Sequence, residues 1–168
     1  MKLQQILSRL QKLHPKEIDL SLDRIKKLCK KLGNPQDNLK YISVIGTNGK
    51  YSTIQAIRAI LKDANINCNI YTSPHIQKIN ERFIFNDQPL NDDQLLDLFT
   101  EVEEINNGST ITFFEILTVC YFYFASKFPN NINLIEAGLF HRFDATNVLI
   151  KNLASVITIL GNDHLDWL

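Results

Sequence analysis

The chain contains few of the residues that build disulfide frameworks, metal centres or membrane spans. Its 168 residues include three cysteines, Cys29, Cys68 and Cys120, which lie far apart and form no C-x-x-C pair. This usage argues against a disulfide framework or a zinc site and suits a reducing cytosol. No stretch approaches the roughly 18 consecutive apolar residues of a membrane span, and the amphipathic N-terminus differs from a secretory signal. The absences predict a cytoplasmic protein with no membrane partner.

Neither sign of charge predominates, because 18 Lys and Arg residues balance 18 Asp and Glu residues. A balanced surface produces no global field that favours nucleic acid, so no nucleic-acid partner is expected. The chain is 45% hydrophobic and 21% charged, as in ordinary globular domains. Its length corresponds to about one domain with a core of its own. Since no repeat, low-complexity segment or linker interrupts it, the sequence predicts a single domain over residues 1–168.

Apolar spacing predicts helices that alternate with strands. Helices are expected over about 3–13, 23–32, 50–64 and 112–127, with a further helix after Asn91 as its N-cap. Strands are expected over about 41–45, 67–71, 82–85, 133–136 and 155–160, the last two of them buried. The buried side of helix 50–64 is expected to hold Ile54, Ile57, Ile60 and Leu61. This alternation predicts an α/β fold with a mostly parallel sheet flanked by helices.

The turn at 46–50, Gly-Thr-Asn-Gly-Lys, lies between an apolar strand and a helical pattern. Such a turn makes a phosphate cradle, because backbone N–H groups and the positive end of the helix dipole face the anion. The turn departs from the strict phosphate-loop pattern, since Val44 replaces its first glycine and Tyr51, Ser52 and Thr53 follow the lysine. The alternative is an ordinary strand-to-helix turn with a surface lysine.

Polar side chains also follow three other predicted strands, namely Ser73, Glu136 and His164. Ligands of open α/β sheets bind at the carboxyl ends of the strands, so these side chains are expected to converge on the glycine turn. Simpler interpretations exist: Ser73 shapes a turn before a proline, and His164 is a surface histidine. Burial of an unpaired carboxylate costs free energy, which favours a cation partner for Glu136.

Seven segments, spread in order over almost the whole chain, carry a resemblance to a known family. They are Ile18-Asp19-Leu20, Gly46 to Lys50, Tyr71 to His75, Asn80-Glu81-Arg82, Thr112 to Glu115, Asp144 to Asn147 and Asp163-His164. With these segments the chain resembles the folylpolyglutamate synthase/dihydrofolate synthase family, which is related to the Mur cell-wall ligases. Members of that family join glutamate to a folate-type carboxylate. ATP phosphorylates the carboxylate, and the amino group of glutamate attacks the acyl phosphate.

The resemblance implies a site for ATP and Mg²⁺. The residues that would wrap the ATP phosphates are Thr47, Asn48, Gly49 and Lys50, with Ser52 close by. Mg²⁺ would be held by Ser73, Glu136 and His164. Magnesium suits such a site because it bridges phosphate oxygens and takes hard oxygen ligands. No residue is assigned as catalytic.

The resemblance also implies a substrate site for folate or dihydropteroate, with L-glutamate as the second substrate. The residues that would line the pterin site are Thr112, Phe113, Phe114, Glu115, Phe143, Asp144 and Ala145. The region from Pro15 to Ile18 would close over it. Core packing is the alternative role for at least one of the two adjacent phenylalanines, since the same predicted helix is rich in aromatic residues.

The sequence departs from the family at three places. Tyr51 stands where the family has glycine, and Phe140 and His141 replace two glycines of a substrate loop. The family also continues beyond the position of Leu168 into a C-terminal ligase domain, so the chain is interpreted as a truncated ATP-binding domain of the P-loop type. An open sheet edge is expected next to its last strand.

Three interpretations follow from the resemblance and the departures. The first is an ATP-dependent ligase by lineage. The second is a non-catalytic nucleotide- or pterin-binding module, complemented by a separately encoded C-terminal half. The third is a remnant without a ligand.

Overall fold

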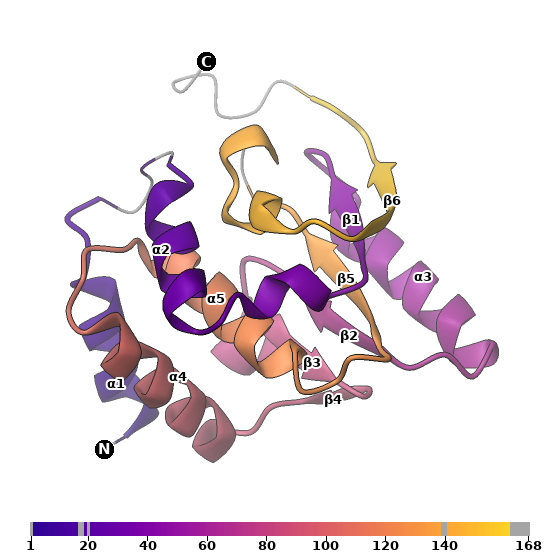
Figure 1. Ribbon diagram of the computed structural model, residues 1–168. Helices are drawn as coiled ribbons and strands as arrows, with labels where there is room; N and C mark the ends of the chain where they lie inside the picture. Colours follow the sequence, from indigo (N-terminus) through magenta and orange to yellow (C-terminus); the bar gives the residue numbers. More distant parts are fainter. Residues whose placement is uncertain (1, 17–18, 20, 139–140, 162–168) are drawn as a thin grey trace.

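The centre of the fold is a sheet of mostly parallel strands, in a computed structural model that describes residues 2–16, 19, 21–138 and 141–161. The strands are β1 (Tyr41–Ile45), β2 (Cys68–Tyr71), β3 (Phe83–Phe85), β4 (Gln88–Pro89), β5 (Ile132–Glu136) and β6 (Asn152–Ile157). Their order is β4-β3-β2-β5-β1-β6 (Figure 1). β2, β5, β1 and β6 run parallel, while β3 pairs antiparallel with β2 and β4. The predicted mostly parallel sheet is confirmed.

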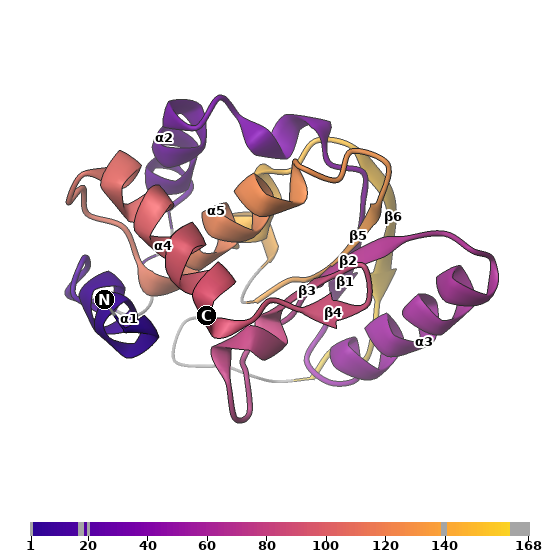
Figure 2. The same cartoon turned by 90° about the horizontal axis from the view of Figure 1, so that it is seen from below.

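Helices cover both faces of the sheet, as Figure 2 shows. They are α1 (Leu3–Gln11), α2 (Asp23–Lys31), α3 (Lys50–Asp63), α4 (Asp92–Asn106) and α5 (Phe113–Ala125). Short 3₁₀ turns are η1 (Pro35–Asn38), η2 (Ile79–Arg82), η3 (His141–Phe143) and η4 (Ala145–Val148). α3 lies on one face, and the other four helices lie on the opposite face. No helix within the described ranges is long and apolar enough to cross a membrane.

Side-chain caps fix where two of these helices begin. The Asn91 side chain accepts a hydrogen bond from the Gln94 N–H at the start of α4, and Thr112 accepts one from the Glu115 N–H at the start of α5. A cap of this kind satisfies an N–H group that has no partner inside the helix. The predicted N-cap at Asn91 is therefore confirmed. Every residue of α5 from Ile116 to Phe122 is buried, because the helix lies between the sheet and its neighbours.

The core consists of two clusters, one on each face of the sheet. The larger cluster lies beneath α1, α2, α4 and α5 and is rich in aromatic rings. The ring centroids of Tyr71 and Tyr121 are 4.8 Å apart, and those of Phe83 and Phe99 are 5.5 Å apart. The smaller cluster lies beneath α3 and contains Val44, Ile54, Cys68, Ile70 and Leu134. All three cysteines are free and buried.

A buried network of asparagines joins the amino ends of β2 and β5. Asn133 is fully buried, and its Oδ1 accepts hydrogen bonds from Asn69 Nδ2 at 3.2 Å and from the Tyr121 hydroxyl at 2.9 Å. Its Nδ2 donates to the Lys40 carbonyl at 3.0 Å. The Asn131 amide donates in turn to Asn69 Oδ1 at 2.9 Å. Because a one-residue slip of either strand would break these bonds, the network fixes the register of β2 on β5.

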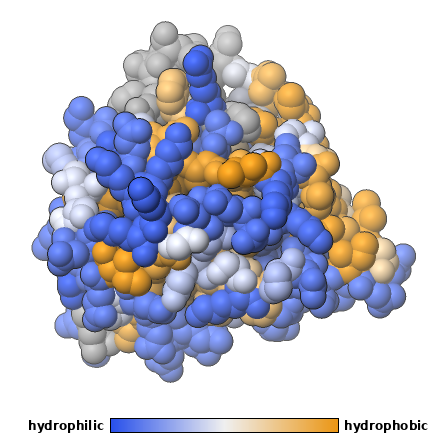
Figure 3. Space-filling view, in the orientation of Figure 1, coloured by the Kyte–Doolittle hydropathy of each residue, from blue (hydrophilic) through white to orange (hydrophobic). Residues whose placement is uncertain are grey.

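Two expectations about burial are wrong. Ile60 is 68% exposed and does not belong to the smaller core, and among the described residues α3 alone covers this face of the sheet (Figure 2). The last strand spans Asn152–Ile157 and is exposed rather than buried, with Leu153 53% and Ile157 65% exposed. In the described part of the chain β6 pairs with β1 alone, so the expected open edge is confirmed. Apolar side chains gather on the side where β6 and α3 lie (Figure 3).

The asparagine network predicts a large loss of stability in Asn133→Leu. Asn69 Nδ2, the Tyr121 hydroxyl and the Lys40 carbonyl would lose a partner, at roughly 1–3 kcal/mol for each buried group. We expect the free energy of unfolding, measured by urea titration, to fall by about 3 kcal/mol. Asn67→Leu, at an exposed asparagine two residues before Asn69, is the control and should change it by less than about 0.5 kcal/mol. Equal effects would contradict this role of the network.

The two isoleucines of α3 give a second test of the fold. Ile54→Ala should lower the free energy of unfolding by about 2–4 kcal/mol, because it leaves a cavity in the smaller core. Ile60→Ala, on the same helix, should change it by less than about 0.5 kcal/mol because the side chain is exposed. A loss at Ile60 as large as that at Ile54 would contradict the position of α3. Thermal and urea unfolding of the two variants measure the difference.

Candidate functional site

The carboxyl ends of β1, β5 and β2 lie side by side, because these three strands are neighbours in the sheet. The Gly46–Lys50 turn follows β1, Glu136 ends β5, and Ser73 follows β2. The Ser73 N–H donates to Glu136 Oε2 at 3.0 Å, so the ends of β2 and β5 are in direct contact. The predicted convergence holds for these three segments. His164, the fourth predicted member, lies outside the described residues.

The conformation of the glycine turn is fixed by its positive φ values and by contacts with residues 158–159. Gly46 and Gly49 have φ values of 141° and 84°, which disfavour any other residue. A Cβ at Gly46 would lie 2.0 Å from Thr158 Oγ1. The Thr47 N–H donates to the Ile159 carbonyl at 2.9 Å, so it is not directed at an anion. The backbone of Asn48 also pairs with that of Ile159 in an isolated antiparallel bridge, so this part of the turn is joined to the segment that follows β6.

Lys50 folds back over the turn and faces Glu136. Its Nζ donates to the Gly46 carbonyl at 2.9 Å and to the Thr47 carbonyl at 3.3 Å, and it lies 3.7 Å from Glu136 Oε1. Burial raises the pKa of the Glu136 carboxyl, while the Ser73 N–H and the Lys50 ammonium lower it. A carboxylate that is buried between an N–H donor and an ammonium group is a site for cation exchange or proton transfer.

Tyr51 and Ser52 lie in the first turn of α3. Any residue except proline can adopt the helical backbone conformation here. Tyr51, which stands where the family has glycine, therefore needs no positive φ. Its ring is 58% exposed and occupies no space inside the turn. Ser52 is exposed beside it, and its hydroxyl forms no hydrogen bond with any described residue.

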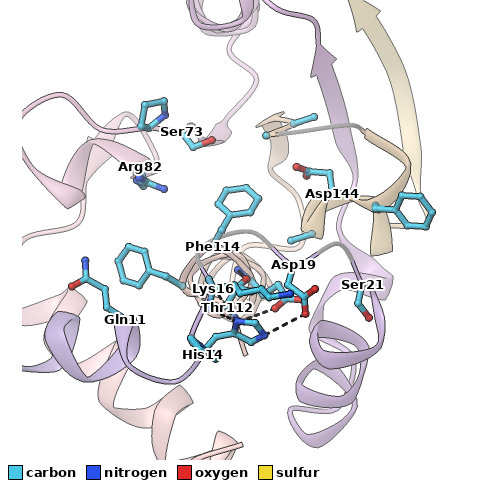
Figure 4. Close-up of a pocket in the computed structure, with 18 of the residues that line it drawn as sticks. Gln11, His14, Lys16, Asp19, Ser21, Ser73, Arg82, Thr112, Phe114 and Asp144 are labelled. Carbon is cyan, nitrogen blue, oxygen red and sulfur yellow. Dashed lines mark hydrogen bonds and ion pairs between the residues drawn. The ribbon is translucent and has the colours of Figure 1, made fainter. Parts of the chain in front are cut away.

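A cavity of about 830 Å³ opens beside the turn (Figure 4). It is lined by Gln11, His14, Pro15, Lys16, Asp19, Ser21, Lys50, Ser73, Pro74, Arg82, Thr112, Phe113, Phe114, Glu115, Ala137, Gly138, Phe143, Asp144 and Ala145. All seven residues of the predicted pterin site belong to this lining. Of the predicted phosphate-binding residues Lys50 alone belongs to this lining, so the cavity joins the end of the glycine turn to the predicted pterin site. Pro15 and Lys16 also line it, while the remaining residues of the region expected to close over it, 17–18, lie outside the described residues.

Aromatic rings and an acid form one wall of the cavity. Phe114 stacks on Tyr71 with centroids 6.2 Å apart, and Phe143 is 45% exposed. Asp144 is buried, and its Oδ1 accepts hydrogen bonds from the Thr146 N–H and hydroxyl. A Cβ at Gly138 would lie 2.7 Å from Asp144 Oδ2 and 3.2 Å from the Phe114 ring. Glycine is thus required where β5 leads past this wall.

The start of α5 forms the adjoining wall. Glu115 Oε2 accepts hydrogen bonds from the Thr112 N–H at 2.8 Å and from Arg24 Nε at 3.0 Å. Its Oε1 is buried and has no partner among the described residues. An unsatisfied carboxylate oxygen in a cavity wall calls for a donor from a ligand or from water. Thr112 and Glu115 therefore cap the helix and line the cavity together.

Arg82 is the cavity residue whose role the sequence did not indicate. It ends η2, is 9% exposed, and donates from Nε to His75 Nδ1 at 2.9 Å. Burial and the Arg82 charge lower the pKa of His75, in keeping with a neutral ring that accepts this bond. The residue lay within a motif segment, but its own position in that segment does not reveal that it points into a cavity. Only the fold of the loop between β2 and β3 places it there.

Ser73 and Glu136 are the two described members of the expected magnesium set. Ser73 and Glu136 offer a hydroxyl and a carboxylate, the hard oxygen donors that Mg²⁺ prefers. No cluster of three or more His, Cys, Asp or Glu side chains that could hold a metal occurs in the described ranges. The donor set fits the ion in kind, and further ligands would come from phosphate, water or the third predicted residue.

Comparisons with known proteins identify the relatives of this chain. A scan against models of protein families found no match. The dihydrofolate synthase/folylpolyglutamate synthase of Bacillus subtilis is 37% identical over 155 residues, which are 88% of this chain and 36% of the relative. The enzyme of the same name from Escherichia coli is 33% identical over 162 residues, or 96% of this chain and 38% of the relative. The chain thus spans a little over a third of the length of these curated relatives.

Solved structures agree with the sequence matches. E. coli FolC in complex with DHPP and ADP has a TM-score of 0.92 and 32% identity over 100% of this chain and 40% of its own. The Yersinia pestis bifunctional synthase complexed with AMPPNP and Mn ion has a TM-score of 0.89 and 31% identity, covering 100% of this chain and 41% of its own. In sequence and in fold, the chain belongs to the dihydrofolate synthase/folylpolyglutamate synthase family, over a stretch that corresponds to about two fifths of a solved member.

Proposed function

We propose that this chain forms the nucleotide and folate-type acid sites of an ATP-dependent ligase that adds glutamate to the acid through an acyl phosphate. One observation supports the proposal: Lys50, at the end of the glycine turn, and the aromatic wall line the same cavity. In such a space an acid bound against Phe114 would present its carboxylate to the phosphate cradle. ATP and L-glutamate are the co-substrates of this proposal, Mg²⁺ the metal, and the cytoplasm the location.

Each part of the site has a separate task in the proposed reaction. The backbone N–H groups of the turn and of the first residues of α3, together with the Lys50 ammonium, would hold the phosphates, and the bound nucleotide would supply the transferable phosphoryl group. To do so, Lys50 Nζ would exchange its two carbonyl partners for phosphate oxygens. Glu136 and Ser73 would hold the metal, which neutralises phosphate charge.

The aromatic wall would orient the acid. Phe114 and Phe143 offer ring faces for a pterin, while buried Asp144 and the unpartnered Glu115 Oε1 offer acceptors for its N–H groups. Orientation matters because the carboxylate must approach the terminal phosphate in line, and positioning of this kind supplies much of the rate enhancement in group transfer.

The second candidate function is binding without turnover, with catalysis completed by a separately encoded C-terminal half. The exposed edge of β6 favours it, since a further strand or a partner could pair there. This reading uses the same nucleotide and pterin sites. Formation of ADP from ATP, pteroate and glutamate by the chain alone would support the ligase, whereas binding of both ligands without ADP formation would support the binding module.

The phosphate cradle predicts weaker nucleotide binding in Lys50→Met. Hydrogen bonds to charged groups contribute roughly 1.5–3 kcal/mol, so we expect the Kd for Mg-ADP to rise by about 10- to 100-fold. Calorimetric titration measures it. Lys62→Met, at the other end of α3 and on its exposed side, is the control and should leave the Kd unchanged. No heat from the unaltered chain at millimolar Mg-ADP would refute the nucleotide site.

The aromatic wall predicts weaker binding of pteroate in Phe114→Ala. Loss of one ring face should raise the Kd by about tenfold, at roughly 1 kcal/mol or more for an aromatic pair. The Kd for Mg-ADP should stay the same, since the ring does not touch the cradle. Phe124→Ala, on the same helix but packed against Phe85 and Phe128, should leave pteroate binding unchanged. Quenching of pteroate fluorescence measures the Kd for pteroate in each variant, and calorimetric titration measures the Kd for Mg-ADP.

A further inference from the structure

Arg82 is a buried cation whose guanidinium is only partly satisfied by the protein. Its Nε donates to His75 Nδ1, and its two Nη nitrogens donate to none of the described residues. Within the described ranges no carboxylate lies within 4.0 Å of the guanidinium. Removal of such a charge from water costs free energy unless an anion or several acceptors compensate it. The Nη groups are therefore available to a partner that enters the cavity.

The position of Arg82 limits what that partner can be. Arg82 lines the cavity, and Figure 4 shows it beside Ser73, across Phe114 from Thr112 and His14. An acid whose rings lie against Phe114 would extend its carboxylate toward Arg82 and the cradle. A planar guanidinium with both Nη groups available binds a carboxylate through two parallel hydrogen bonds.

Two other cations line the cavity, Lys16 and Lys50. Lys16 is exposed to solvent, whereas Arg82 is buried. Lys50 Nζ is occupied by the Gly46 and Thr47 carbonyls and faces Glu136, and in the proposed function it turns to the phosphates. Arg82 has no such partners among the described residues, so it is the buried cation that is available to the acid.

We propose that Arg82 binds the carboxylate of the acid substrate and that His75 positions its guanidinium. This assignment rests on the proposed function and names the residue that selects an acid over its neutral analogues. His75 acts through Nδ1, which fixes the rotation of the guanidinium and leaves the Nη edge toward the cavity.

Hydrogen bonds within the loop between His75 and Arg82 fix the positions of these two residues. Glu81 Oε2 accepts a hydrogen bond from the Ile76 N–H at 2.8 Å, and its Oε1 accepts bonds from the N–H groups of Gln77 and Lys78 at 2.9 and 2.8 Å. These bonds fasten the segment after His75 to the turn that carries Arg82. A fastened loop keeps the imidazole and the guanidinium at a fixed separation, which is what positioning requires.

The experiment compares the affinities of pteroate and of pteroamide, its neutral carboxamide, for the full chain. The unaltered chain should bind the acid at least about tenfold tighter than the amide, as a charged bidentate pair predicts. Arg82→Met should abolish this preference by weakening the acid alone, and Arg82→Lys should keep part of it. Arg58→Met, at an arginine paired with Asp87 away from the cavity, should leave the preference unchanged.

Two His75 variants separate positioning from a merely structural role. His75→Ala removes the acceptor and should reduce the preference for the acid, whereas His75→Asn places an amide oxygen near the position of Nδ1 and should restore it. Equal loss in both variants would overturn the positioning role. Circular dichroism establishes that each variant is folded. If Arg82→Met does not fold, the partial preference expected of Arg82→Lys is the deciding measurement.

The outcomes distinguish this assignment from the proposed function. Equal binding of acid and amide by the unaltered chain would overturn the role of Arg82 and leave the pterin site intact. The same holds if Arg82→Met weakens both ligands to the same extent. Failure of both ligands to bind would overturn the proposed function, and the assignment with it.

Discussion

Parallel pairing of β5 with both β1 and β2 is the constraint on which the site depends. It places the carboxyl ends of three strands from distant parts of the chain at one edge, where Gly46, Ser73 and Glu136 meet. The buried asparagines at the opposite ends of β2 and β5 hold this alignment. A slip of one residue would turn Glu136 to the other face and separate it from Lys50. The polar network far from the site therefore sets the geometry of the chemistry.

The sequence predicted best the features that depend on neighbouring residues. The cap at Asn91 follows from a local conformational preference. The convergence of Ser73 and Glu136 on the turn followed from a general rule about parallel sheets. Most of the fold and the outline of the site were within reach of such reasoning, and the resemblance supplied the pterin residues.

The failures have a common physical cause, which is that burial and hydrogen bonding are decided by distant segments. Helical spacing placed Ile60 on a buried face, but no described element covers it there. The Thr47 N–H donates to the Ile159 carbonyl, a contact that the pattern of the turn does not reveal. The sequence around Arg82 does not show that the side chain is buried. Only the fold shows this, and shows that no carboxylate of the described residues lies within 4.0 Å of its guanidinium. Contacts across more than a hundred residues leave no mark in local spacing.

The contacts between the glycine turn and residues 158–161 link two parts of the molecule thermodynamically. Thr47 donates to Ile159 and accepts from Gly161, while Thr158 packs on Gly46 and donates to the Ile45 carbonyl. The segment after the exposed edge strand is thus part of the wall of the cradle. A ligand that binds only the well-formed cradle must also favour the docked edge strand, and anything that covers that strand must in return favour the ligand. Under the proposed function, nucleotide affinity and attachment of the sheet edge would therefore be one coupled equilibrium.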